Sequence, residues 1–193
     1  MLEKATVEIR GLVPMLMHRV TTEALEGSQP GKRKKKDAKY FEEKRQEWRE
    51  TAYWDEELGL YIPSMNLEAC LIEASKGERM SGNKYLKPLV QAGLFVEEHR
   101  IGLDTPDDIR TLDDVERLGW VFTVPVRIKS DRIPRRRVKV PSGWTARFTV
   151  LVNNELLSRE NAEELLEKAG TQVGLMDWRP KFGRFEVVSV RWH

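Results

Sequence analysis

The sequence predicts an α+β fold whose elements follow the order β-α-β-β-α-β. Alternating apolar and polar residues mark strands at 5–17, 93–104, 144–152 and 185–192. Apolar residues at helical spacing mark two helices, at 61–76 and 157–169. This order is typical of ferredoxin-like (RRM-like) domains. Because many unrelated functions use that fold, the function must be argued from particular residues.

The chain has 193 residues, and we expect a single RRM-like domain over 1–193. Charged residues make up 33% of it, yet the net charge is only +2, so a nucleic-acid interface would depend on where the charges lie. The single cysteine excludes an internal disulfide and a cysteine zinc site. Nothing at the N-terminus resembles a signal peptide, and no apolar run approaches the roughly 20 residues that span a bilayer. We therefore expect a cytoplasmic protein with no membrane contact.

Two histidines are candidates for chemistry. His18 follows the first strand, directly before Arg19, and imidazole titrates near neutrality, so it could act as a general acid or base. A lone histidine is more often packed or hydrogen-bonded without chemistry. His99 allows the same two interpretations, and no neighbouring cysteine or histidine completes a metal site around it.

A charged insertion, 20–58, interrupts the predicted core. Its basic run, Lys32–Lys36, could be a localisation tag, a disordered tail or a contact to polyanions. The helix that follows has a narrow apolar stripe, formed by Tyr40, Phe41, Trp48 and Ala52. Such a stripe is too thin for a core helix, so we expect this helix on the surface or against another subunit.

The first core helix is predicted to begin with Ser64 as its N-cap. Its buried face comprises Leu67, Cys70, Leu71 and Ala74. Cys70 on this face is expected to be a small core residue and not a reactive thiol.

A polar, glycine-bearing segment follows this helix. It could contact nucleic acid through three lysines and stack a base on a tyrosine, or it could be a plain surface loop. The residues concerned are Lys76, Lys84, Tyr85 and Lys87.

The most distinctive stretch is a basic block, 127–143, between strand-like runs at 120–129 and 144–152. We expect a long hairpin with these runs as its arms and an irregular basic tip, because Pro134, Pro141 and Gly143 interrupt pairing. Guanidinium groups at such a tip could all turn toward a phosphate backbone; a solvated loop is the alternative. The candidate ligands are Arg127, Lys129, Arg132, Arg135, Arg136, Arg137 and Lys139.

The second core helix is predicted to start at a Ser158 cap and to stop at Gly170. The next segment, 171–183, combines two glycines, an aromatic ring and positive charge, which suits close approach to a sugar-phosphate strand. The alternative is a loop that packs its tryptophan into the core. The candidates here are Trp178, Arg179, Lys181 and Arg184, with Arg19 as a further cation.

Three motifs carry a resemblance to a known family: GLVPMLM at 11–17, YIPSMNLEACLIEA at 61–74 and GLMDWRPKFGRFEV at 174–187. With the basic hairpin, they resemble the repeat-associated RNA-binding (RAMP) superfamily, in particular the RNA-binding backbone subunit of class 1 CRISPR surveillance complexes and uncharacterised relatives carried by bacteriophages. Ser64 and Leu67 match the family's helix motif, whereas its glycines are missing. The resemblance implies a subunit that polymerises along RNA, with the hairpin as a thumb and the insertion as a contact to its neighbour.

Three classes of function stay open. The favoured one is a non-catalytic, oligomerising binder of single-stranded nucleic acid, with RNA favoured over DNA. The second is an endoribonuclease of the same superfamily that uses His18 or His99. The third is a structural or partner-binding protein of a mobile element. No nucleotide-binding or metal-ligand motif is recognisable, so we expect no cofactor and no metal. We also expect a ring or filament of identical subunits, which other complex subunits could join.

Overall fold

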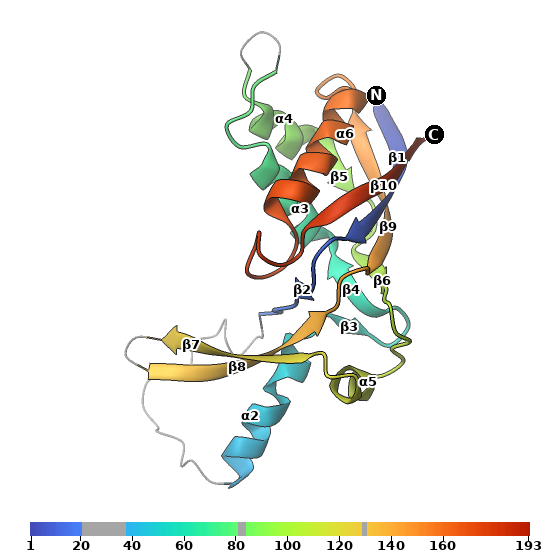
Figure 1. Ribbon diagram of the computed structural model, residues 1–193. Coiled ribbons are helices and arrows are strands. Elements are labelled where there is room, and N and C mark those ends of the chain that lie inside the picture. Colours follow the sequence, from blue (N-terminus) through green and yellow to red (C-terminus); the bar gives the residue numbers. More distant parts are fainter. Residues whose placement is uncertain (21–37, 81–83, 129–130) are drawn as a thin grey trace.

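The computed structural model describes residues 1–20, 38–80, 84–128 and 131–193, with the backbone alone for 38–44, 126–128 and 131–133. The basic run at 32–36 lies outside the described residues. The ferredoxin-like core is one antiparallel sheet with the strand order β10-β1-β9-β6 (Figure 1). These strands are β1 (Leu2–Gly11), β6 (Arg100–Asp104), β9 (Thr145–Asn153) and β10 (Phe185–Trp192). The predicted α+β, ferredoxin-like fold is confirmed.

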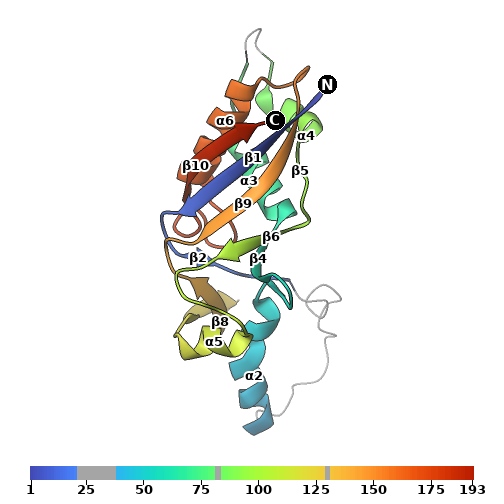
Figure 2. The same ribbon diagram turned by 90° about the vertical axis from the view of Figure 1, so that its right-hand side faces the viewer.

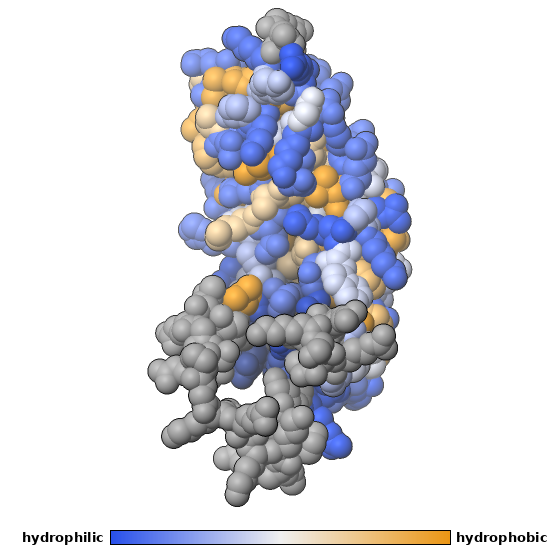
Figure 3. Space-filling view, turned by 90° about the vertical axis from the view of Figure 1, so that its left-hand side faces the viewer, coloured by the Kyte–Doolittle hydropathy of each residue, from blue (hydrophilic) through white to orange (hydrophobic). Residues whose placement is uncertain are grey.

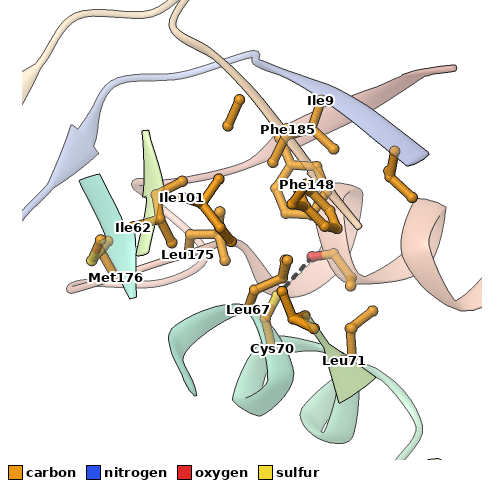
Figure 4. Packing of buried hydrophobic residues seen from close by; sticks show 14 of the residues in the cluster. Ile9, Ile62, Leu67, Cys70, Leu71, Ile101, Phe148, Leu175, Met176 and Phe185 are labelled. Atoms are coloured by element: carbon orange, nitrogen blue, oxygen red, sulfur yellow. Dashed lines mark hydrogen bonds between the residues drawn. The ribbon is translucent and has the colours of Figure 1, made fainter. Parts of the chain in front are cut away.

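The two helices α3 (Ser64–Ala74) and α6 (Arg159–Lys168) cover one face of this sheet, and the other face is open (Figure 2). Alternation places Ala5, Val7 and Ile9 of β1 toward the helices, and all three are fully buried. The predicted face of α3 belongs to the same buried cluster, and the Cys70 thiol donates a hydrogen bond to the Ala169 carbonyl at 3.4 Å (Figure 4). The core thus follows the apolar periodicity of the sequence.

Further elements surround this core. Three short strands extend the sheet: β5 pairs with β9, while β4 and β3 continue the order beyond β6. A second, three-stranded sheet has the order β2-β8-β7. The additional bounds are β2 (Met15–Leu16), α2 (Ala38–Thr51), β3 (Trp54–Asp55), β4 (Gly59–Pro63), α4 (Leu86–Gly93), β5 (Leu94–Val96), α5 (Leu112–Arg117), β7 (Val121–Ile128), β8 (Asp131–Val140) and the π-helical turn η1 (Ala169–Val173).

The hairpin prediction was wrong about its second arm. Its first arm is β7, but β7 pairs with β8, which contains the basic block itself, and 145–153 belongs to the core sheet. The prediction of an irregular tip was also wrong, because β8 pairs regularly with β7 from Asp131 to Val138, with Pro134 directly opposite Pro125. Proline is tolerated here because β7 is an edge strand and β8 meets β2 only at Lys139 and Val140.

Two of the three predicted helix boundaries need correction. Ser64 is the first residue of α3, its N-cap is Pro63, and no side chain caps this helix. Ser158 does cap α6, because its hydroxyl accepts a hydrogen bond from the Asn161 N–H at 3.2 Å. Gly170 does not stop α6, since the chain continues into η1. A glycine fits there because a Cβ atom would lie 2.4 Å from the Phe185 carbonyl oxygen.

Two segments pack more than their composition indicated. The end of α2 belongs to the core, since Trp48 is fully buried and Ala52 nearly so. The charged helix is therefore anchored at its C-terminal end, and no side chain is described for Tyr40 or Phe41. The segment expected to be a polar loop continues into α4, which buries Leu86 and Val90.

Candidate nucleic-acid interface

The β7–β8 hairpin presents one strongly cationic face. Arg137 lies directly opposite Phe122 and Arg135 directly opposite Val124, so these side chains share a face, as does Lys139 two residues further on. Arg136 is opposite Thr123 and lies on the other face. Regular pairing therefore separates the three consecutive arginines, which the predicted irregular tip would have kept together.

A glycine-bounded loop, 174–184, docks beside this hairpin. The Asp177 N–H donates to the Leu16 carbonyl at 3.0 Å, and the Gly183 N–H donates to the Pro14 carbonyl at 2.9 Å. Gly183 has a φ of 77°, and a Cβ there would lie 2.0 Å from the Leu175 carbonyl oxygen, so only glycine closes the loop. The loop and the cationic face of the hairpin are thereby fixed next to each other through β2.

Three aromatic rings join the loop to the hairpin. The Phe182 ring centroid lies 6.1 Å from that of Trp178 and 6.1 Å from that of Phe122. Phe182 is buried, Phe122 is half-buried, and Trp178 remains 40% exposed. The loop therefore does not pack Trp178 into the core.

A cation lies over each ring. The Lys139 Nζ is 4.9 Å from the Phe122 centroid, the Lys181 Nζ is 6.0 Å from the Phe182 centroid, and the Arg137 Cζ is 6.0 Å from the Trp178 centroid. We name this region the hairpin–loop surface; it comprises Phe122, Arg135, Arg137, Lys139, Trp178, Lys181 and Phe182. Stacking planes and positive charge of this kind are what single-stranded nucleic acids contact.

The three consecutive arginines all have partners within the chain. Arg135 is paired with Glu47 of α2, and Arg137 with Asp177 of the loop. Arg136 lies 3.4 Å from a Glu116 carboxylate oxygen of α5, and it also donates to the Arg45 carbonyl of α2. Burial and the neighbouring Arg135 lower the pKa of Arg137.

His18 lies at the edge of the hairpin–loop surface. Its Nδ1 is 3.7 Å from an Asp177 carboxylate oxygen, which is beyond hydrogen-bonding distance. Burial, followed by the nearby Arg137 and Arg135, lowers the pKa of His18. His99 is exposed elsewhere, and its carbonyl accepts a hydrogen bond from the Ser64 N–H at 3.1 Å.

The lysines after α3 do not join the hairpin–loop surface, since α4 and the hairpin lie at opposite ends of the molecule (Figure 1). Lys76 pairs with Glu73 at 2.5 Å, while Lys84 and Tyr85 are exposed and Lys87 is half-buried on α4. The Arg79 Cζ lies 4.4 Å from the Tyr85 ring centroid, a contact that competes with base stacking. Lys76 does meet Arg179 across a hollow of about 540 Å³ between α3, η1 and the loop.

The remaining sequence candidates are spread around the interface. Arg19 and Arg184 are both exposed. Arg127 and Arg132 pair across the hairpin through their backbones, and their side chains are outside the described part, as is all of Lys129. Sequence reasoning missed the acids that hold the arginines, Glu47, Glu116 and Asp177, because they are distant in sequence and carry no motif.

The open face of the sheet is a poor RNA platform. RRM domains stack bases on aromatic side chains of this face, but here its central strands β1 and β9 present only polar and aliphatic side chains. Ion pairs cross it instead: Lys4 with Glu97, Arg10 with Glu186, and Arg147 with Glu8. Figure 3 shows the opposite side of the molecule, where the helices cover the sheet, and the coloured part of that side is largely hydrophilic with scattered apolar patches.

Within the described ranges, no three histidine, cysteine or acidic side chains come together as a metal site. Across the same part of the chain, no helix is both long and apolar enough to cross a bilayer. The absence of a cofactor stays a prediction.

No protein-family model matches the chain, and no curated protein matches its sequence. Its structure is similar to that of a chain in the type III-B Cmr-beta complex bound to cognate target RNA, with 11% identity over 99% of this chain and a TM-score of 0.51. The match spans 60% of that longer chain. Cmr6 from Pyrococcus furiosus is matched at 11% identity over 97% of this chain and 98% of its own, with a TM-score of 0.44.

The likeness to the Cmr-beta chain agrees, at the level of fold, with the resemblance to CRISPR-complex subunits that the sequence motifs indicated. At 11% identity it shows no more than the fold.

Proposed function

We propose that this chain is a non-catalytic, RAMP-type subunit that binds single-stranded RNA on the hairpin–loop surface. The carrying observation is the exposed Trp178 ring, flanked by Arg137, Lys139 and Lys181 on two elements that the fold fixes together. Met176 and Trp178 adopt left-handed backbone conformations, with φ of 64° and 55°, which are uncommon for residues other than glycine. Backbone strain of this kind clusters at ligand sites, which supports the proposal.

Trp178 is the most exposed ring of the aromatic series, so we expect one base to stack there. RNA is favoured over DNA because the similar Cmr-beta structure is bound to target RNA. Phosphate contacts would dominate affinity, with little dependence on base sequence.

Fluorescence anisotropy with labelled single-stranded RNA and DNA of equal length tests this function. Trp178→Ala should weaken RNA binding by about 1 to 3 kcal/mol, the size of one stacking contact, while Trp178→Phe should retain most of it. Lys4→Ala, on the open sheet face, is the control and should leave affinity unchanged. A protein that binds no single-stranded RNA, or a Trp178→Ala variant with full affinity, would refute the proposal.

One observation favours a second candidate, an endoribonuclease. Burial, with Arg137 and Arg135 nearby, lowers the pKa of His18, so its imidazole could take the proton of an RNA 2′-hydroxyl. RNA that stays intact with wild-type protein excludes this candidate. Cleavage that His18→Ala abolishes and His99→Ala preserves would establish it.

We also propose that the subunits assemble head to tail into a ring or filament, together with other complex subunits. The hairpin and α2 extend from one end of the molecule, which leaves them available to a neighbour (Figure 1). Light scattering with and without RNA tests the assembly, and a strict monomer in both samples would contradict it. A structural or partner-binding role without RNA is distinguished by the absence of salt-dependent RNA binding.

A further inference from the structure

The consecutive arginines of β8 form a second pattern, distinct from the RNA contact expected of them. Each reaches a different element: Arg135 reaches α2, Arg136 reaches α5 and the backbone of α2, and Arg137 reaches the glycine loop. The partners lie 88, 20 and 40 residues away in sequence. One tripeptide thus connects the hairpin to three separate parts of the fold.

These pairs are partly shielded from solvent, the Arg137–Asp177 pair most and the Arg136–Glu116 pair least, since Glu116 is 41% exposed. The Arg137 side chain is 12% exposed, and its partner Asp177 is 28% exposed. Arg135 and Arg136 are 37% and 24% exposed, and Glu47 is 17% exposed. Charge-assisted pairs in such places are costly to break from one side, because the other charge is left unpaired.

Asp177 accepts a hydrogen bond from Nη1 of Arg137, so a phosphate bound to the other N–H groups of this guanidinium would lie beside the Asp177 carboxylate. The two negative charges would repel each other. Lys139 and Lys181 face no such conflict, because within the described residues neither has a carboxylate at ion-pair distance. Both lie on the hairpin–loop surface over aromatic rings.

We propose that Arg135, Arg136 and Arg137 are positioning residues that brace the hairpin against α2, α5 and the glycine loop, while Lys139 and Lys181 make the phosphate contacts. This inference rests on the proposed function, since it divides the same surface into braces and ligands. The braces hold Lys139 of β8 in register with the loop that carries Trp178 and Lys181.

The salt dependence of RNA affinity separates the two roles. Each phosphate contact to a single strand contributes about 0.7 to the slope of log affinity against log salt. Lys139→Ala and Lys181→Ala should each lower this slope by about 0.7. Arg137→Ala should weaken binding and lower the melting temperature with no change in slope, and Arg135→Ala and Arg136→Ala should behave alike. An Arg137→Ala slope that falls as far as that of Lys139→Ala would overturn the proposal.

Two further variants test the same claim if Arg137→Ala folds poorly. Asp177→Asn removes the carboxylate that holds the Arg137 guanidinium group. If Arg137 is a brace, this change should lower the melting temperature and should not tighten RNA binding. Tighter binding would show that Arg137 is a phosphate ligand. The exchange of Arg137→Asp with Asp177→Arg should restore stability and affinity that either single change loses. No recovery in the double variant would contradict the brace.

Failure of this inference is distinguishable from failure of the proposed function. Wild-type protein that binds no RNA refutes the proposed function. The melting temperatures of the Arg137 and Asp177 variants, measured without RNA, show separately whether Arg137 is a brace.

Discussion

Gly183 is the residue on which the loop geometry depends most directly. A side chain there meets the Leu175 backbone, with a Cβ at 2.0 Å from the carbonyl oxygen and 2.7 Å from the nitrogen, and backbone atoms cannot move aside cheaply. Gly183→Ala should therefore lower the free energy of unfolding by at least about 3 kcal/mol and weaken RNA binding.

Gly77→Ala is the matched control for this change. Gly77 has a similar φ of 78° but no atom within 4 Å of the added Cβ, so only the backbone penalty of about 1 to 2 kcal/mol applies. Urea unfolding measures the free energy of unfolding of both variants. Equal losses in the two variants would show that the close approach of Gly183 is not maintained in solution.

Cys70 is expected to be inert. Burial raises its thiol pKa to about 12, so the thiolate that reacts is almost absent at pH 8. A thiol reagent at pH 8 should modify Cys70 only at the rate of unfolding, and rapidly in denaturant. Fast modification of the folded protein would contradict the buried position.

The residues of the core could be predicted from sequence, whereas the partners of the charges could not. Leu67, Cys70 and Leu71 are buried as their helical spacing indicates, because periodicity reports burial directly. Asp177 and Glu47 give no such signal, since an acid that pairs with a distant arginine looks like any surface acid.

Helix α5 provides a pH-dependent element. Asp114 accepts hydrogen bonds from the Arg117 side chain and from the N–H groups of Arg110 and Thr111, and its pKa falls to about 2. A carboxylate with a lowered folded pKa stabilises the protein above its ordinary pKa, and this contribution disappears as the pH falls through about 2.

Asp114→Asn should therefore lower the melting temperature at neutral pH, and the difference from wild type should shrink as the pH falls toward 2. Thermal melting from neutral to acidic pH measures it. A difference that is constant over this range would contradict the capping role of the carboxylate.

The hairpin shows why elements outside the core were harder to predict. The runs at 121–128 and 145–153 both alternate, and nothing local decides whether they pair with each other or with different sheets. Pro134 and the arginines obscure the strand pattern of β8. They are tolerated because β8 pairs with β7 alone along most of its length and meets β2 only at its end. The segment was correctly recognised as a basic hairpin, and its strand register required the structure.

At the scale of the whole molecule, the order of the core elements was sufficient to predict the ferredoxin-like fold. The second sheet was not predicted, since β2 has two residues and β8 meets it only at Lys139 and Val140. This small sheet positions the candidate interface, because β2 also accepts the hydrogen bond of Asp177 from the glycine loop. Local patterns thus define the scaffold, and non-local contacts define the site.

The most direct test of the central claim is the salt dependence of single-stranded RNA binding for two variants with equal loss of charge. Lys139→Ala with Lys181→Ala removes two cations from the hairpin–loop surface, and Lys4→Ala with Arg191→Ala removes two from the core sheet. The account predicts a slope lower by about 1.4 for the first pair and no change for the second. Equal effects of the two pairs would mean that RNA binds by net charge alone, and would contradict an interface at the hairpin and the glycine loop.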